Sequence, residues 1–181
     1  AYVPAAKKSV AYAGEHTALS ADRVLLDART FAKMLDSLNI RPTDLVLDLG
    51  CGMGYSSAVI SRLAEAVVAV EEDADLAAVA TETLSDMSVD NVLVTHAKLS
   101  EGNPKHGPYD VVITEGAIEE LPQAIADQIK DGGRIVAIMQ QDNLSQCRIG
   151  YRSEGTISWR SAFDASAPLL AGFETQEEFA F

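Results

Sequence analysis

The stretch "LVLDLGCGMGYSSAV", Leu45 to Val59, decides the fold of this chain. It begins with an apolar run typical of a buried strand and ends in residues typical of a helix. Between them, glycines at positions 50, 52 and 54 allow the backbone to turn sharply and to approach a bound molecule closely. A strand, a glycine loop and a helix in this order are typical of the ligand-binding edge of an open α/β sheet. A plain tight turn is the alternative, but it does not require so many glycines.

The rest of the chain repeats the alternation of strand and helix patterns. Short apolar strands separated by helices imply βαβ units, and therefore a mostly parallel sheet with helices on both faces. Two alternating runs around Ser153–Gly155 predict an antiparallel hairpin at the sheet edge, within 145–163. The other predicted strands are 45–49, 66–71, 91–96, 109–114 and 134–139, and the predicted helices are 27–38, 55–64, 75–87 and 118–130.

Length and composition bound the organisation of the chain. With 181 residues, of which 48% are hydrophobic, it fits one domain, 1–181. We expect an N-terminal segment that covers the substrate (1–43), a ligand-binding core (44–140) and a C-terminal hairpin with a tail (141–181). Because the chain starts at Ala1 without a methionine, we also expect that the native N-terminus is absent from it.

The charge of the chain limits its partners. A formal net charge of −13 works against binding to nucleic acids or to anionic membranes. No apolar run approaches the roughly 20 residues that cross a bilayer, and we expect no signal peptide. The sequence therefore predicts a cytoplasmic protein without nucleic-acid or membrane partners.

Cysteine and histidine positions do not indicate a metal site. Cys51 and Cys147 are far apart in the sequence and fit no metal-binding spacing. His16, His96 and His106 form no ligand cluster either. We therefore expect two free thiols, as in a reducing compartment, and no metal.

Two classes of ligand compete for the glycine loop. A dinucleotide site prefers G-x-G-x-x-G, whose third glycine admits the pyrophosphate, but here that position is Tyr55. Asp48 stands two residues before Gly50, where a carboxylate repels pyrophosphate and attracts an ammonium group. S-adenosylmethionine carries an ammonium, a sulfonium and no phosphate, so the charge at this loop favours it over a dinucleotide.

An acidic residue ends the next predicted strand. Nucleoside-binding folds of this kind place an acid about 20 residues after the glycines, where it accepts hydrogen bonds from the ribose. Glu71 occupies this position, and its neighbour Glu72 should point the other way. An acid at a strand end is often merely solvated, but together with the glycine loop we interpret Glu71 as the ribose-binding residue.

Over nearly its whole length the chain resembles the protein-L-isoaspartate O-methyltransferase family, a class of S-adenosylmethionine-dependent methyltransferases. "AYVPAAKKSVAYAGE" is similar to the first segment of that family, and "LVLDLGCGMGYSSAVISRLA" is similar to its first cofactor motif. "VVAVEEDADLAAVA" is similar to the second motif, and residues 91–136 follow the family order through two further strands. The first motif is shared by many methyltransferases, whereas the ordered series is much more specific.

The resemblance implies a Rossmann-like class I methyltransferase fold with S-adenosyl-L-methionine as cofactor. The implied activity is methylation of the abnormal carboxylate of isoaspartyl residues in damaged proteins, which begins their repair. Because that carboxylate is already ionised at neutral pH, the reaction needs no general base, and we assign no catalytic residue. The implied cofactor-binding residues are Asp48, Gly50, Cys51, Gly52, Gly54, Tyr55, Ser56, Glu71, Glu72, Ala97, Lys98, Leu99 and Glu115.

The chain departs from the family where a hydroxyl donor is expected. The family carries T-I-S ahead of the helix that precedes the first core strand. Without gaps, its threonine falls on Val24 and its serine on Leu26, and neither side chain donates a hydrogen bond. Thr17 and Ser20 lie upstream, but nothing in the sequence places them in the cleft.

Two further departures concern charge. Lys98 stands where the family has an aspartate that meets the adenine amine, and an ammonium cannot accept that hydrogen bond. Glu115 adds a carboxylate near the reacting centre, which would oppose an anionic substrate. Besides isoaspartyl methylation, we therefore keep three alternatives: another methyl acceptor, a non-catalytic interaction protein and, most distant, a dehydrogenase.

Overall fold

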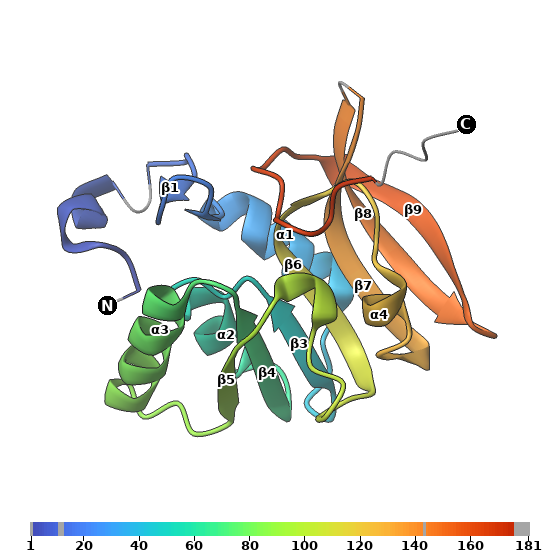
Figure 1. The fold of residues 1–181 in the computed structure, drawn as a ribbon, viewed down its shortest axis with the longest axis horizontal. Coiled ribbons are helices and arrows are strands. Elements are labelled where there is room, and N and C mark those ends of the chain that lie inside the picture. The colour runs from blue at the N-terminus through green and yellow to red at the C-terminus, as the bar shows by residue number, and fades with distance from the viewer. Residues whose placement is uncertain (1, 11–12, 143, 176–181) are drawn as a thin grey trace, which may run out of the picture.

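A computed structural model shows one seven-stranded sheet at the centre of the molecule (Figure 1). Its strands lie in the order β5 (Val92–His96), β4 (Ala66–Glu71), β3 (Leu45–Leu49), β6 (Tyr109–Ile118), β7 (Ile129–Gln141), β8 (Leu144–Ser153) and β9 (Thr156–Asp164). The structure describes residues 2–10, 13–142 and 144–175. Parts of the predicted N-terminal segment and of the predicted C-terminal hairpin and tail lie outside the described residues: 1, 11–12, 143 and 176–181.

The sheet is mixed, as predicted. The strands from β5 through β7 pair in parallel, whereas β8 and β9 pair antiparallel. β8 and β9 form the predicted hairpin, with Glu154 and Gly155 at its turn at φ angles of 52° and 77°. The predicted fold class is therefore confirmed, and the hairpin extends the sheet on its β7 side.

Four α-helices of the described chain connect or cover these strands. Their bounds are α1 (Ala28–Leu38), α2 (Tyr55–Ile60), α3 (Ala74–Asp86) and α4 (Gln123–Ala126). Asp27 caps α1, as the sequence predicts, by accepting hydrogen bonds from the backbone N–H groups of Arg29 and Thr30. Such a cap stabilises a helix by about 1 kcal/mol. Within the described ranges, no helix is long and apolar enough to cross a membrane.

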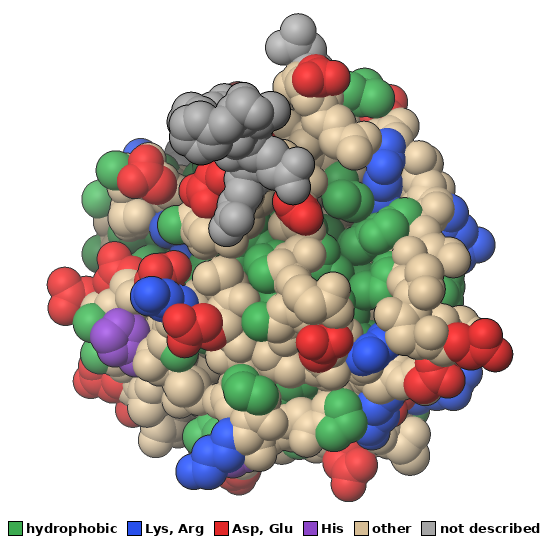
Figure 2. All heavy atoms as spheres, turned by 45° about the vertical axis from the view of Figure 1, so that its right-hand side comes forward, with side chains coloured by type: hydrophobic (Ala, Val, Ile, Leu, Met, Phe, Trp, Pro, Cys, Tyr) green, Lys and Arg blue, Asp and Glu red, His purple; other side chains and the backbone are tan. Residues whose placement is uncertain are grey.

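Apolar side chains pack on both faces of the sheet. On one face, Phe31 and Met34 of α1 and Ile60 of α2 pack in one cluster with alternate residues of the central strands, such as Val67. On the other face, Val68 packs in a second cluster, together with Ile125 of α4 and residues of the C-terminal segment that follows β9. On the side of the molecule that carries β8 and β9, Figure 2 shows hydrophobic side chains among the charged ones.

One predicted helix, 118–130, is mostly wrong. β6 continues to Ile118, α4 is confined to Gln123–Ala126, and β7 already begins at Ile129. Ile118, Ile125 and Ile129 have helical spacing in the sequence, but they reach the second cluster from a strand end, a short helix and a strand start. The helical spacing of these buried residues therefore led to the prediction of a long helix that the chain does not form.

The N-terminal segment forms a small layer of its own. It contains a 3-10 helix, η1 (Ala5–Val10), and a two-stranded antiparallel sheet of β1 (Thr17–Ala18) and β2 (Val24–Leu25). His16 connects this layer to the rest of the protein. Its Nδ1 accepts a hydrogen bond from the backbone N–H of Asp27 at 2.9 Å, and its Nε2 lies 2.7 Å from the carbonyl oxygen of Ser166. The segment thereby meets the chain that follows β9.

Candidate active site

Three acidic side chains meet at the edge of the sheet where the direction of the crossovers reverses. From β3 the chain passes to β4 and β5 on one side, and it then returns to β6 on the other side of β3. Open α/β sheets bind their ligands at such a switch point, beyond the carboxyl ends of the strands. Asp48 of β3, Glu71 of β4 and Glu115 of β6 lie here.

The loop after β3 requires its glycines for backbone geometry. Gly50, Gly52 and Gly54 have φ angles of 92°, 56° and 90°, in the left-handed region that side chains disfavour. A Cβ atom at Gly52 would also lie 2.5 Å from Cδ1 of Leu19. The loop therefore presents bare backbone to the N-terminal segment.

Asp48 lies completely inside the protein. The hydroxyls of Ser56 and Ser57 donate to its Oδ2 at 2.7 and 2.6 Å, while its Oδ1 has no hydrogen-bond partner among the described residues. Burial raises the pKa of Asp48 to about 6, although the two serine hydroxyls favour the ionised form. The carboxyl therefore lies close to its ionisation point near neutral pH. The sequence analysis named Ser56 but missed Ser57.

Glu71 is fully buried at the end of β4. The backbone N–H groups of Gly52, Glu72 and Asp73 donate to its carboxylate at 2.7, 2.9 and 3.1 Å. Glu71 thus ties the glycine loop to the start of the connection into α3. Glu72, in contrast, is exposed.

The sequence analysis missed one side chain of this site, Arg23. Its Nη1 donates to Oε1 of Glu71 at 2.7 Å, and its Nη2 donates to Oε2 of Glu71 at 3.1 Å and to the carbonyl oxygen of Gly50 at 2.8 Å. The Arg23 side chain is only 11% exposed, so this bidentate ion pair is largely shielded from solvent. A signal was available, because Arg23 is the only lysine or arginine between Lys8 and Arg29.

Glu115 reaches the site through an irregularity in β6. The pairing of β6 with β7 shifts between Ile113 and Ala117, and such bulges redirect side chains near active sites. Glu115 is 4% exposed, and its Oε1 has no hydrogen-bond partner among the described residues. Burial, and then the nearby Asp48 carboxylate, raises the pKa of Glu115 well above its usual value. The raised pKa favours the uncharged form of Glu115, which weakens the repulsion expected for an anionic substrate.

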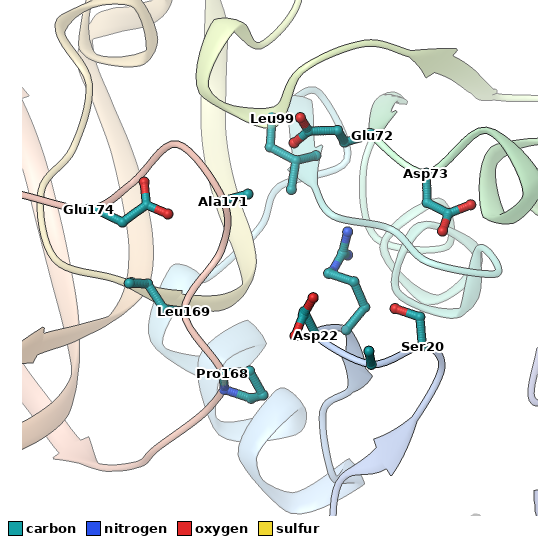
Figure 3. A pocket seen from close by; sticks show the side chains of 11 residues that line it. Ser20, Asp22, Glu72, Asp73, Leu99, Pro168, Leu169, Ala171 and Glu174 are labelled. Carbon is teal, nitrogen blue, oxygen red and sulfur yellow. The ribbon is translucent and has the colours of Figure 1, made fainter.

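A cavity of about 550 Å³ opens beside this cluster (Figure 3), a size typical of small-molecule sites. Figure 3 shows Ser20 and Asp22 of the N-terminal segment across the cavity from Glu72 and Leu99, which follow β4 and β5. The C-terminal segment 168–174 forms another wall. Three parts of the chain that are distant in sequence therefore enclose one space.

Of the predicted cofactor residues, Glu72 and Leu99 line this cavity, and the side chains of two others make contacts elsewhere. Lys98 is 69% exposed and pairs with Glu101 at 3.7 Å, so its charge stays at the surface. The ring of Tyr55 packs against Phe31, with ring centroids 5.8 Å apart, on the side of the first cluster. The backbone N–H of Ala97 donates to the carbonyl oxygen of Glu71 at 3.1 Å.

The two cysteines are buried and free. Burial raises the pKa of Cys51 well above its usual value and that of Cys147 to about 12, so both remain thiols. In the described part of the chain, no group of three His, Cys, Asp or Glu side chains is arranged to hold a metal ion.

The positions that replace the family hydroxyls belong to the packing of the protein. Leu26 is 2% exposed in the first cluster, and Val24 packs against the same cluster. Thr17 is buried in β1, whereas Ser20 lines the cavity. The structure therefore places one of the two upstream hydroxyl groups at the site, which the sequence did not predict.

A glycine loop, a buried acid on the next strand and a cavity at the switch point define a nucleoside-binding α/β fold of the methyltransferase class. A sequence model of the family described as Protein-L-isoaspartate(D-aspartate) O-methyltransferase (PCMT) matches residues 1–163. The chain belongs to this family. Membership confirms the predicted enzyme class, a methyltransferase that uses S-adenosyl-L-methionine, and it overturns the dehydrogenase alternative.

Curated relatives agree with this assignment. A protein-L-isoaspartate O-methyltransferase of Helicobacter pylori (strain G27) is 35% identical over 142 residues, which are 78% of this chain and 68% of the relative. One of Koribacter versatilis is 33% identical over 162 residues, which are 90% of this chain and 73% of the relative. The present chain is thus shorter than both relatives.

Two solved structures share the fold. One, a protein-L-isoaspartate O-methyltransferase, has a TM-score of 0.79 at 19% identity, over 87% of this chain and 52% of that chain. The other, a beta-aspartate methyltransferase from Plasmodium falciparum in complex with S-adenosyl-L-homocysteine, has a TM-score of 0.76 at 19% identity, over 90% of this chain and 83% of that chain. At this identity the comparison supports the architecture, and the roles of individual residues rest on the geometry of the site.

Proposed function

We propose that this chain methylates the carboxylate of isoaspartyl residues in peptides and proteins, with S-adenosyl-L-methionine as the methyl donor. The observation that carries the proposal is the hydrogen-bonding pattern of Glu71. Its carboxylate accepts two donors of one guanidinium, and the two hydroxyls of a ribose present a similar pair. Family membership supports the same reading.

The other polar groups of the site also fit this cofactor. The carbonyl oxygen of Gly50 already accepts from a cation at 2.8 Å, and an amino-acid ammonium is a cation of similar chemistry. The glycines of the loop carry no side chains, but the side chains of Arg23 and Leu19 lie against two of them, so a cofactor has to displace these side chains. Asp48 adds a buried carboxyl with a free oxygen. We therefore keep the predicted cofactor-binding residues as part of the proposal, except that Lys98 contributes only its backbone.

When bound, S-adenosylmethionine supplies a methyl group on a sulfonium that needs no further activation. The acceptor carboxylate is ionised at neutral pH, so the chain has no proton to remove. What its residues contribute is position: the acceptor oxygen has to be held in line with the transferred methyl group. Ser20–Arg23 and residues of 168–174 form walls of the cavity, and we assign the positioning of the acceptor to them.

The same geometry supports the predicted division of the chain. We propose that the core 44–140 binds the cofactor, while Ser20–Arg23 of the N-terminal segment 1–43 and residues of 168–174 in the C-terminal part 141–181 form the acceptor side of the cavity. We also propose a cytoplasmic location, which is consistent with Cys51 and Cys147 being free thiols, because reducing compartments keep thiols reduced.

Ligand binding and methyl transfer test the proposal in two steps. S-adenosylhomocysteine at about 100 times its dissociation constant should stabilise the protein by about 2.7 kcal/mol in a thermal melt. Labelled cofactor should then transfer its methyl group to an isoaspartyl peptide and not to the matching aspartyl peptide. Binding without transfer would favour another acceptor, and the absence of binding would favour an interaction protein.

A further inference from the structure

Arg23 hydrogen-bonds to the same acceptor atoms that the proposed function assigns to the cofactor. Its guanidinium binds both oxygens of Glu71 and the carbonyl oxygen of Gly50. Among the described residues that line the cavity, Arg23 is also the only lysine or arginine. The inference below concerns this residue and rests on the proposed function.

The carboxylate of Glu71 cannot serve Arg23 and a ribose at the same time. Its Oε1 accepts from Arg23 and from the backbone N–H groups of Glu72 and Asp73, and its Oε2 accepts from Arg23 and from the N–H of Gly52. A carboxylate offers about four acceptor sites, and these are already taken. The backbone donors belong to the fold, so the donors that leave when a ribose binds are those of Arg23.

A displaced guanidinium has a partner close by in Glu115. A Cβ atom built on Gly50 would lie 2.7 Å from Nη2 of Arg23 and 3.6 Å from Cβ of Glu115, so both side chains flank the same backbone atom. Nε of Arg23 and Oε1 of Glu115 are both buried and without a partner among the described residues. An unpaired buried charge is costly. When a ribose occupies Glu71, the displaced guanidinium of Arg23 therefore needs another acceptor, and Oε1 of Glu115 is available nearby.

Apart from Arg23, the described residues that line the cavity include no lysine or arginine. Asp22, Glu72, Asp73 and Glu174 line it, and their carboxylates repel an anionic substrate. Ser20 offers only a neutral hydroxyl. An arginine, in contrast, carries five N–H donors in a planar fork that matches a carboxylate.

We propose that Arg23 binds the carboxylate of the methyl acceptor, and that the cofactor releases Arg23 for this role by displacing it from Glu71. One edge of the guanidinium then pairs with Glu115 and the other faces the acceptor. Binding is consequently ordered, with the cofactor first, because an Arg23 held on Glu71 and Gly50 has both Nη atoms engaged and only its buried Nε unpaired. By linkage, the acceptor and the cofactor strengthen each other's binding by the same factor.

Calorimetric titration with S-adenosylhomocysteine tests the displacement. Arg23→Met keeps the apolar stem and removes the ion pair, so it should bind S-adenosylhomocysteine about tenfold more tightly than the wild type. Arg23→Lys keeps the charge without the fork and should fall between the two. Arg29→Met, at an exposed arginine of α1, is the matched control and should bind like the wild type. Weaker or unchanged binding by Arg23→Met would overturn the displacement.

Titration of the S-adenosylhomocysteine-saturated protein with an isoaspartyl peptide tests the acceptor role. The wild type and Arg29→Met should bind the peptide, and without S-adenosylhomocysteine this binding should be weaker by about tenfold or more. In saturated Arg23→Met the peptide affinity should fall by about tenfold or more, with partial recovery in Arg23→Lys. Unchanged peptide affinity in Arg23→Met would overturn the acceptor role.

These outcomes remain separate from a failure of the proposed function. A wild type that does not bind S-adenosylhomocysteine refutes the cofactor site itself. A wild type that binds it but neither binds nor methylates the isoaspartyl peptide refutes the acceptor, and with it the acceptor role of Arg23, while the first titration still decides the displacement. If a thermal melt of Arg23→Met shows no folding transition, both titrations are made with Arg23→Lys. Its affinities for S-adenosylhomocysteine and for the peptide should change in the same directions by smaller factors.

Discussion

Replacing Asp48 with asparagine should change how the stability of the protein depends on pH. Burial raises the pKa of Asp48 from 3.8 to about 6, and one pKa unit corresponds to about 1.36 kcal/mol. Ionising this carboxyl inside the protein therefore costs about 3 kcal/mol. Asparagine keeps the size of the side chain and does not ionise, so Asp48→Asn removes this cost.

The sign follows from the raised pKa. The folded protein binds the Asp48 proton more tightly than the unfolded chain does, so this contribution to stability is complete below about pH 3.8 and is lost as the pH rises through about 6. The free energy of unfolding of Asp48→Asn minus that of the wild type should thus rise by about 3 kcal/mol between about pH 3 and about pH 7. Urea unfolding at a series of pH values measures this difference.

A second aspartate provides a control of opposite sign. Although burial opposes it, the N–H of Leu45 and the ammonium of Lys130 lower the pKa of Asp110. The stability that Asp110 contributes is present above its usual pKa and is lost as the pH falls, so Asp110→Asn should be most destabilising near neutral pH. A difference for Asp48→Asn that is flat over the same range would refute the reasoning and indicate that water reaches Asp48.

Three further substitutions test the site. Glu71→Gln should weaken S-adenosylhomocysteine binding by about 1–3 kcal/mol in calorimetry, since it leaves polar partners unpaired; an unchanged affinity would remove Glu71 from the site. Gly52→Val should abolish that binding, because a branched side chain at a φ of 56° distorts the loop, whereas Gly132→Val, at a φ of 79° with open space around it, should bind normally after the same strain. Leu26→Ser should lower the free energy of unfolding by about 2 kcal/mol or more without raising methylation of an isoaspartyl peptide, because this side chain faces the core; a gain of activity would place it in the cleft instead.

The order of the core elements could be predicted because it depends on local patterns. The apolar runs at 45–49 and 66–71 became β3 and β4 with the predicted bounds. Asp27 caps α1 at the predicted position. Where local spacing misled, as between Ile118 and Ile129, the buried residues came from different elements that the sheet brings together. Helical spacing alone does not distinguish one continuous helix from such a convergence.

The candidate site could be predicted in part. Glycines at 50, 52 and 54 and an acid at 71 follow from the chemistry of the cofactor and from a spacing along the chain. The partners of those residues do not, because Arg23 meets Glu71 across 48 positions of sequence. The approach of Glu115 also depends on a bulge in the pairing of β6 with β7, which no local pattern announces.

The sequence by itself determined the fold class, the family and the cofactor loop, since each depends on residues close together along the chain. Only the tertiary structure decided the state of the charges: which cation faces Glu71, how far burial shifts Asp48 and Glu115 from their usual ionisation, and which hydroxyl lines the cavity. The physical reason is that charge energies depend on distance and on exclusion of water. Both are set by the packing of segments that are far apart in the sequence.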